Sequence, residues 1–229
     1  MDVKTLPGLT GNQLKLIAMA AMTCDHIGLE LLPQWSLLRI IGRLALPVFG
    51  YMIAEGCRHT RSPKRYLLRL EALALLCQIV YYFAMDSLYQ SILVTFFLSA
   101  CLIFAWDNWQ RNPGTGSGLT LGAALFTLGL VTLWLPRAVP GFAIDYGLWG
   151  VLLPVGVYLP KRRQTRLWLC GGCLVALALD YGGLQWFGLL ALPLLAAYNG
   201  QRGKWRIGRL FYIYYPAHLA AIHLLSQFV

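Results

Sequence analysis

Residues 14–32 read LKLIAMAAMTCDHIGLELL, and this stretch decides the fold class. It is long enough to cross a bilayer as a helix, which takes about 20 mostly apolar residues. Yet it contains Lys15, Asp25, His26 and Glu30. Because an ionisable side chain inside a membrane is costly, such groups usually face protein or water and serve a function. The stretch therefore predicts a membrane-spanning helix that carries a functional site.

The rest of the chain shares this apolar character. Of its 229 residues, 58% are hydrophobic and only 12% are charged, whereas an average soluble domain carries about 25% charged residues. Such a chain could not cover a soluble surface, and its apolar segments follow one another with short gaps. We therefore expect an all-α, polytopic membrane protein that forms a single domain over residues 1–229.

The apolar segments predict about nine transmembrane helices. We place them at 13–32, 35–56, 66–84, 89–106, 118–136, 142–160, 166–181, 183–199 and 208–228. The first reads as a retained helix and not as a signal peptide, because it holds charged residues and no small-residue cleavage site follows it. The seventh and eighth are short and could instead form a broken or re-entrant pair. Pro47 lies inside the second, where we expect a kink or a loosened backbone.

The loop charges give these helices a direction. Thirteen of the 19 basic residues fall in loops on one side of the nine-helix arrangement. They are Arg58, Arg61, Lys64, Arg65, Arg111, Lys161, Arg162, Arg163, Arg166, Arg202, Lys204, Arg206 and Arg209. The opposite loops carry Asp86, Arg137 and Asp180 and have no basic bias. The positive-inside rule then places the N-terminus in the cytoplasm and the C-terminus outside. It also accounts for the net charge of +10, so we expect no nucleic-acid partner.

The six cysteines do not predict a metal site. Most of them fall inside apolar runs, and the one CxxC, Cys170 and Cys173, sits in a predicted helix. No second CxxC and no nearby histidine completes a zinc-binding set. We read the cysteines as small buried residues and expect no metal.

Lys15 and His26 in the first helix form the most informative pair. The histidine lies eleven residues after the lysine, or about 16 Å along a helix axis, which puts Lys15 at the cytoplasmic end and His26 past mid-depth. Glu30 can share a face with His26 at i+4, whereas Asp25 points about 100° away. Alone, Lys15 could be snorkelling to the interface and His26 could be a hydrogen-bonded core residue. Four ionisable groups in one helix favour a function.

Arg43, in the second helix, is expected to lie close to His26 in depth. It could pair with Asp25 or Glu30, or hold an anionic substrate. An ion pair that only locks the first two helices together is an equally good alternative.

Three further residues are candidates for substrate binding. Asp145 lies near the outer start of the sixth helix, and Tyr215 and His218 lie in the ninth. His218 is expected near mid-depth, at about the level of His26. The alternative for His218 is a core histidine satisfied by a neighbour, although two histidines after a proline in one span favour a function.

Basic residues after the second helix have two possible explanations. Membrane topology accounts first for Arg58, Arg61, Lys64 and Arg65. Yet a cluster of Arg and Lys at the inner face is also what a carrier with several phosphates would bind. The sequence leaves both explanations open.

Both ends of the chain resemble the TraX family. The matching stretches are LTGNQLK at 9–15 with DHIG at 25–28, IGRLALPVFG at 41–50 with AEG at 54–56, and FYIYYPAHL at 211–219. The middle of the chain matches only as a series of spans. Members of the family include the conjugative-plasmid protein that acetylates the N-terminus of pilin. The family is also similar to the larger transmembrane acyltransferase group, which includes the acyltransferase-3 proteins.

In that larger group a basic residue in the first span precedes a histidine, with ten residues between them. Lys15 and His26 match this spacing, with Lys in place of the more usual Arg; lysine holds a phosphate as a point charge. The resemblance implies a multi-pass protein of the bacterial inner membrane that transfers an acyl group, such as acetyl from acetyl-CoA. The carrier's phosphates would be held by Lys15, Arg58, Arg61, Lys64 and Arg65. Its pantetheine arm can reach about 15–20 Å, comparable to the helical rise from Lys15 to His26.

A mechanism follows as a hypothesis. Neutral His26 would take the proton from an attacking amine or hydroxyl as general base. Glu30 or Asp25 would fix its tautomer, and Arg43 would orient a substrate or balance charge. The acceptor would be a pilin-like protein, a glycan or a small amine, and an acyl-histidine intermediate is possible.

Two other classes of function use the same residues. A proton-coupled transporter or flippase also needs intramembrane His, Asp and Arg. A structural partner of a secretion or conjugation assembly would tolerate neutral substitutions at Lys15 and His26 together.

Overall fold

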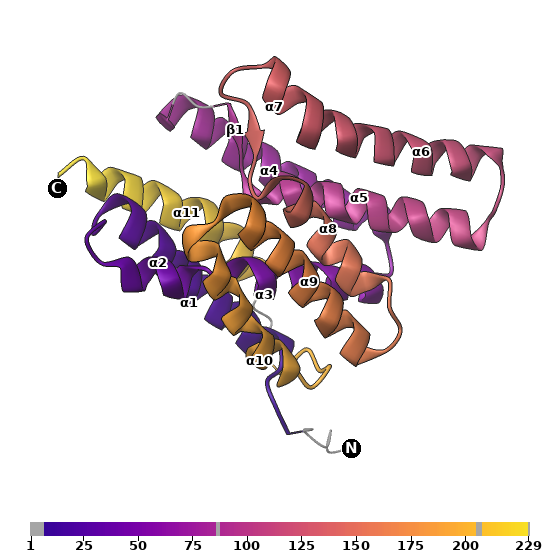
Figure 1. The fold of residues 1–229 in the computed structure, drawn as a ribbon, viewed down its shortest axis with the longest axis horizontal. Helices are drawn as coiled ribbons and strands as arrows, with labels where there is room; N and C mark the ends of the chain where they lie inside the picture. Colours follow the sequence, from indigo (N-terminus) through magenta and orange to yellow (C-terminus); the bar gives the residue numbers. More distant parts are fainter. Residues whose placement is uncertain (1–6, 86–87, 205–207, 229) are drawn as a thin grey trace. The chain divides into compact units, whose positions relative to one another are not determined.

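The computed structural model describes residues 7–85, 88–204 and 208–228, and this part of the chain is mostly helical (Figure 1). Its α-helices are α1 (Gly11–Glu30), α2 (Ser36–Gly42), α3 (Ala45–His59), α4 (Pro63–Met85), α5 (Ile92–Arg111), α6 (Thr115–Gly129), α7 (Leu135–Ala138), α8 (Gly147–Tyr158), α9 (Arg163–Tyr181), α10 (Ala191–Ala196) and α11 (Gly208–Ser226). A π-helical turn, η1 (Leu130–Trp134), joins α6 to α7, and a 3₁₀ helix, η2 (Gly183–Leu190), precedes α10. Two short strands, β1 (Tyr89–Gln90) and β2 (Ala143–Ile144), pair in parallel.

The all-α membrane class expected from the sequence is confirmed. Each of the nine predicted ranges overlaps one or more helices. Among the described residues, three helical segments are long and apolar enough to cross a membrane: Ser36–His59, Ile92–Arg111 and Thr115–Ala138. Gly147–Tyr158 and Gly183–Ala196 are apolar but shorter. The number of crossings and the direction of the chain stay predictions, and two of the charges used for the latter, Asp86 and Arg206, lie outside the described residues.

The chain divides into two compact units. The first unit comprises Met1–Met52 and Leu174–Val229, and the second unit comprises Ile53–Cys173. The single domain expected from the sequence stays a prediction. In the first unit α1 packs against both α2 and α11, and η2 packs against α2 and α10. In the second unit α5 packs against α4, α6 and α8.

Helix α1 begins with a capping box. The Thr10 hydroxyl accepts a hydrogen bond from the Gln13 N–H at 3.4 Å, and the Gln13 side-chain oxygen accepts one from the Thr10 N–H at 2.8 Å. This satisfies backbone donors that a helix start leaves open. The next donor, the Gly11 N–H, is bonded at 2.8 Å to the carbonyl of Gln201 in the loop after α10. The start of α1 is therefore fixed to that loop.

Two glycines allow α1 and α2 to pack closely. A Cβ atom on Gly42 would lie 2.3 Å from the Cβ of Asp25, and one on Gly28 would lie 2.8 Å from the Cβ of Leu38. Small residues of this kind let helix backbones approach each other in membrane proteins. The close approach places Asp25 of α1 directly against α2.

The second predicted helix is interrupted, as expected, close to Pro47. The break lies at Arg43 and Leu44, between α2 and α3. Because proline has no N–H, a helix running through this point could not bond Pro47 to the carbonyl of Arg43. Beginning α3 at Ala45 puts Pro47 in the first turn, where the missing donor costs little.

A corresponding break separates the seventh and eighth predicted helices. Gly182 and Gly183 have φ angles of +65° and +52°, a region that favours glycine. They end α9 and begin η2, so the short eighth segment starts as a 3₁₀ helix. Whether the two segments cross the membrane separately or form a broken pair stays open.

The second unit has a tightly bonded core around α5. The Ser99 hydroxyl lies 2.9 Å from the carbonyl oxygens of both Thr95 and Val151, within hydrogen-bond distance of each. Ala100, Ile103 and Val151 are fully buried in the same cluster. Hydroxyl groups that bond to carbonyls in this way are satisfied without water, which suits a helix inside a membrane.

Candidate functional site

Asp25 on α1 is surrounded by arginines from α2. Its carboxylate makes an ion pair with Arg39 at 3.0 Å and another with Arg43, which is buried. Arg39 also donates to the Asp25 carbonyl at 3.2 Å. Of the roles that the sequence left open for Arg43, the structure therefore shows the pair with Asp25. Removing one member of such a cluster would leave a buried charge without compensation.

His26 on α1 meets His218 on α11. The ring centres are 5.3 Å apart and the ring planes are inclined by 69°. His26 Nδ1 and His218 Nε2 are both buried and have no hydrogen-bond partner in the described part of the chain. Buried polar atoms without partners are uncommon, and each calls for an explanation such as a water molecule or a ligand. Two of them at one contact mark this place as the candidate site.

The other nitrogen of His218 has a fixed role. His218 Nδ1 lies 3.0 Å from the carbonyl oxygen of Tyr214, four residues earlier on α11. A carbonyl can only accept, so Nδ1 carries the hydrogen, and in the neutral ring Nε2 has the lone pair. The unpartnered nitrogen of His218 is therefore its basic nitrogen.

Aromatic side chains hold the His218 ring in place. The Tyr214 ring is stacked on it, with centres 5.1 Å apart and planes within 7°, and the Tyr215 ring meets its edge at 5.6 Å. The Tyr214 hydroxyl is hydrogen-bonded to Thr23 of α1. Thr23 donates to the Met19 carbonyl at 3.0 Å and so accepts from the tyrosine. This contact joins α11 to α1 beside the two histidines.

The carboxylates of α1 do not fix the tautomer of His26 at Nδ1, contrary to expectation. Asp25 binds the two arginines of α2, and Glu30 lies 4.0 Å from Nδ1 of His223. Asp25 does not bond to His26 Nδ1 because its side chain points toward α2, where two guanidinium groups offer stronger charge-assisted bonds. Glu30 does not do so because α11 brings His223 against it.

The start of α1 carries a second cation beside Lys15. The Arg202 carbonyl accepts the Asn12 N–H at 3.0 Å, and the Arg202 side chain is close enough for its charge to act on Lys15. Lys15 is half-buried and Arg202 is exposed. Two positive charges thus gather at the end of α1 that lies eleven residues before His26.

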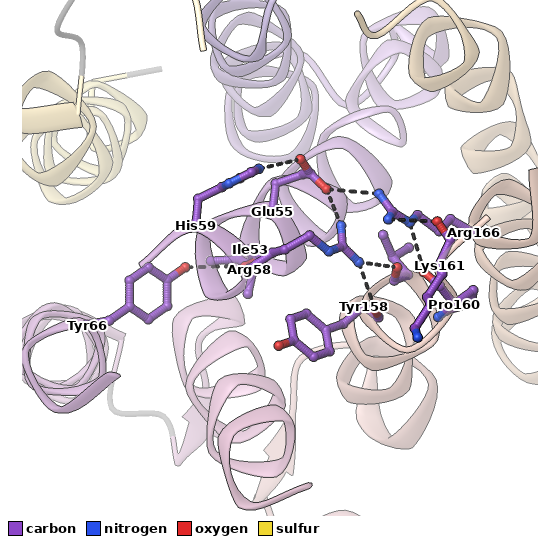
Figure 2. A network of polar contacts seen from close by, with 10 residues as sticks. Ile53, Glu55, Arg58, His59, Tyr66, Tyr158, Pro160, Lys161 and Arg166 are labelled. Carbon is purple, nitrogen blue, oxygen red and sulfur yellow. Dashed lines mark hydrogen bonds and ion pairs between the residues drawn. The ribbon is translucent and has the colours of Figure 1, made fainter. Parts of the chain in front are cut away.

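In the second unit, a network of charges is centred on Glu55 (Figure 2). This buried carboxylate is ion-paired with Arg58, lies 3.5 Å from Arg166 and lies 3.4 Å from the ring of His59. Arg58 and His59 end α3, while Arg166 is in the first turn of α9. Glu55 therefore holds the end of α3 against the start of α9.

The two arginines of the network also bind backbone carbonyls. Arg58 donates to the carbonyl of Tyr158 at 2.7 Å, and Arg166 donates to those of Pro160 and Lys161 at 3.0 and 3.1 Å. These carbonyls belong to the end of α8 and the loop after it, so Arg58 and Arg166 satisfy acceptors that a helix end leaves open. Arg58 thus has structural bonds in addition to any role with a carrier.

The other three loop residues predicted to hold a carrier are at the surface. Arg61, Lys64 and Arg65 are exposed, between the end of α3 and the first turn of α4. Lys15, the fifth member of the predicted set, belongs to the first unit.

Asp145, predicted to bind substrate, is hydrogen-bonded to several elements of the second unit. Its side chain accepts from the Tyr89 hydroxyl at 2.6 Å, its N–H donates to the Gln90 carbonyl at 3.0 Å, and its carbonyl accepts from Thr95 at 2.7 Å. It thereby ties the end of β2 to β1 and α5. Tyr215 and His218, the other two residues of that prediction, belong to the first unit. In residues 7–85, 88–204 and 208–228, no three His, Cys, Asp or Glu side chains gather closely enough to hold a metal ion.

The stretches that build the first unit's site fall inside a family match that covers most of the chain. The family model described as "TraX protein" matches residues 10–226. The chain belongs to the TraX family. The resemblance noted from the two ends of the sequence is thereby confirmed, and the match extends through the middle of the chain.

Curated relatives carry names in keeping with the TraX family. The chain is 27% identical to the "Probable fimbrial assembly protein FimC, serogroup H1" of Dichelobacter nodosus, over 95% of this chain and 96% of that protein. It is 26% identical to "Protein TraX" of Escherichia coli, over 93% of this chain and 86% of that protein. It is 29% identical to an uncharacterized protein of Rickettsia prowazekii, over 79% and 66% of the two chains. No solved structure gives a significant match.

Several residues that make the contacts within the two units were not singled out from the sequence. Tyr214 lies four residues before His218, and Arg39 lies four before Arg43, so helical i,i+4 spacing could have indicated both. Thr23 and Arg166 give no such signal, because their partners are 191 and 111 residues away in the sequence.

Proposed function

We propose that this TraX-family protein is a membrane-embedded acyltransferase. It moves an acetyl or other acyl group from cytoplasmic acyl-CoA to an amine or hydroxyl acceptor, with a buried histidine as general base. The observation that carries the proposal is the contact of His26 with His218, where two buried ring nitrogens have no hydrogen-bond partner within the part of the chain that the structure describes. Proton transfer by a positioned imidazole is what attack of an amine or hydroxyl on a thioester requires.

The carrier end of the site is proposed at the start of α1. Lys15 and Arg202 bring two positive charges together there, which suits a phosphate group. Over the eleven residues from Lys15 to His26 the helix rises about 16 Å, a distance that the extended pantetheine arm of CoA can span. The exposed Arg61, Lys64 and Arg65 would add attraction for the polyanion at longer range.

The ion-pair cluster of Asp25, Arg39 and Arg43 is proposed to support the site. It fixes α2 against α1 at the residue that precedes His26. Arg43 would then act through helix position and local charge, because Asp25 already occupies its guanidinium group. A rigid helix pair keeps the imidazole in one geometry, which catalysis by proton transfer demands.

The acceptor is proposed to be a subunit of a surface filament. The E. coli relative is named "Protein TraX" and the D. nodosus relative a probable fimbrial assembly protein, and the sequence resemblance implies acetylation of a pilin N-terminus. The protein would then lie in the bacterial inner membrane as a multi-pass protein. A glycan or a small amine would suit the same chemistry.

Labelled acetyl-CoA tests the proposal. Native membranes that contain the protein are incubated with labelled acetyl-CoA, and the label is followed into protein, glycan and small-amine fractions. Membranes from a strain without the gene are treated in the same way as the control. We expect transfer only with the gene present, and we expect CoA to raise the melting temperature of the purified protein. No transfer and no stabilisation would overturn the proposal. Proton flux into vesicles that persists without acyl-CoA would instead favour a proton-coupled transporter.

A further inference from the structure

We propose that His218 is the general base toward the acceptor and that His26 delivers the proton to the departing sulfur of the carrier. This assignment rests on the acyl transfer proposed above. It gives a role in proton transfer to both histidines. The general base is then His218 on α11 and not His26, which the sequence spacing selects.

The hydrogen bond of His218 to Tyr214 carries the first half of the assignment. Nδ1 must hold its hydrogen for the Tyr214 carbonyl at 3.0 Å, so the buried Nε2 always presents its lone pair. A base whose second nitrogen donates to a fixed acceptor is held in the one tautomer that can take a proton. His218 is 7% exposed, and an amine or hydroxyl that donates to Nε2 would satisfy that buried nitrogen.

The surroundings of His218 also suit a ring that becomes positively charged. Taking a proton at Nε2 makes an imidazolium, and the ring of Tyr214 lies parallel to it at 5.1 Å. The face of an aromatic ring attracts a cation. The bond between the hydroxyls of Tyr214 and Thr23 keeps that face in place.

His26 differs from His218 in both respects. Its buried Nδ1 has no hydrogen-bond partner among the described residues, so no contact there holds the ring in one tautomer. The neighbouring cluster of Asp25, Arg39 and Arg43 carries one net positive charge, which repels a second one on His26. A proton that reaches His26 is therefore readily given up, which suits a residue that passes it on to the departing sulfur.

The proposed step balances. A bond forms between the acceptor nitrogen or oxygen and the acyl carbon, and the proton of the acceptor moves to Nε2 of His218. The carbon–sulfur bond of the thioester breaks, and its electron pair leaves with the sulfur. The proton on His218 passes to His26 across the edge-to-face contact of 5.3 Å between ring centres, and His26 gives a proton to the sulfur, so both rings end neutral.

His218→Asn is the decisive variant. The asparagine amide can replace Nδ1 as donor to the Tyr214 carbonyl, while the basic Nε2 is removed. We expect acetyl transfer from labelled acetyl-CoA in native membranes to fall about 100-fold or more, the usual contribution of a general base, with stabilisation by CoA unchanged. His59→Asn, at an exposed histidine of the second unit, is the control and should retain transfer. Transfer by His218→Asn within about threefold of the wild type, on the same scale, would overturn the assignment.

A second comparison separates the two histidines. With labelled S-phenyl thioacetate the departing thiolate needs no proton, so His26→Asn should recover most of the wild-type rate while His218→Asn stays low. The rate in membranes without the protein is subtracted. The opposite pattern, or equal losses with both thioesters, overturns the division of roles. Absence of transfer by the wild type would instead overturn the proposed acyltransferase itself.

A measurement on the unmodified pair covers the case in which the His218 variants do not fold. The protein is labelled with ¹⁵N-histidine, and glutamine replaces His59 and His223. Only the rings of His26 and His218 then give histidine signals. Nitrogen NMR should show one ring with hydrogen on Nδ1 and a lone pair on Nε2. Two rings that both carry hydrogen on Nε2 would contradict the structure on which the assignment rests.

Discussion

Arg43 of α2 is ion-paired with Asp25 of α1, and only 7% of the arginine side chain and 15% of the aspartate side chain is exposed. Arg39 makes a second ion pair with the same carboxylate at 3.0 Å. One carboxylate therefore serves two guanidinium groups where little water can screen them, and Coulomb interactions are strong in such a place. The cluster holds the first two helices together beside His26.

Removing the carboxylate should destabilise the protein strongly. Asp25→Asn leaves two guanidinium charges without compensation, and we expect a loss of about 3–5 kcal/mol in the free energy of unfolding. Denaturant unfolding in detergent measures it. Arg111→Gln, which breaks an exposed pair with Asp107, is the control and should cost about 0–1 kcal/mol. Losses of equal size in the two variants would contradict the role assigned to Asp25.

Gly42→Ala tests the close approach of α1 and α2. The added methyl group would lie 2.3 Å from the Cβ of Asp25, so one of the helices must shift, at a cost of about 1–3 kcal/mol. Gly122→Ala is a matched control, because nothing lies within 4 Å of the added atom. In that exposed helix alanine should stabilise by about 1 kcal/mol. We expect opposite changes in melting temperature, and a gain at Gly42 would show that the packing is looser than described.

Glu55→Gln tests the network that joins α3 to α9 (Figure 2). Arg58 and Arg166 keep their carbonyl acceptors but lose the buried charge that balances them. We expect a loss of about 3 kcal/mol in the free energy of unfolding, with acetyl transfer by the surviving folded protein little changed. A large loss of transfer at unchanged stability would instead place Glu55 in the reaction.

The sequence predicts the helices well and the contacts between them only in part. Apolar length and Pro47 locate the helices and one break, because both act within a single segment. The depth of His26 and His218 follows from counting along two helices, and the structure brings the rings together. The partner of Asp25 does not follow from its own helix, because spacing shows which residues share a face but not what the opposite helix offers. Arg166 and Glu55 are 111 residues apart, and no local pattern connects them.

His26→Ala should abolish acetyl transfer without unfolding the protein. The imidazole is at the centre of the proposed chemistry, so we expect a fall of about 100-fold or more in the rate. Labelled acetyl-CoA in native membranes measures transfer, and the melting temperature reports on the fold. His59→Ala provides the control, because 68% of that side chain is exposed. A normal rate in folded His26→Ala would show that the reaction does not use this residue.

Lys15 and Arg202 should share the binding of CoA at the start of α1. Neutralising one cation beside a phosphate removes a charge-assisted contact, and we expect Lys15→Gln and Arg202→Gln each to weaken CoA binding about tenfold, equivalent to about 1.4 kcal/mol. The double variant should lose less than the sum of the two if both contact the same phosphate. Titration of CoA against the purified protein gives the affinities, and the wild type should bind more weakly as salt rises because the contacts are ionic. Arg137→Gln removes a cation from a loop predicted on the opposite side of the membrane, so it should leave affinity unchanged. Equal weakening in that control would mean that net charge, and not this pair, attracts the carrier.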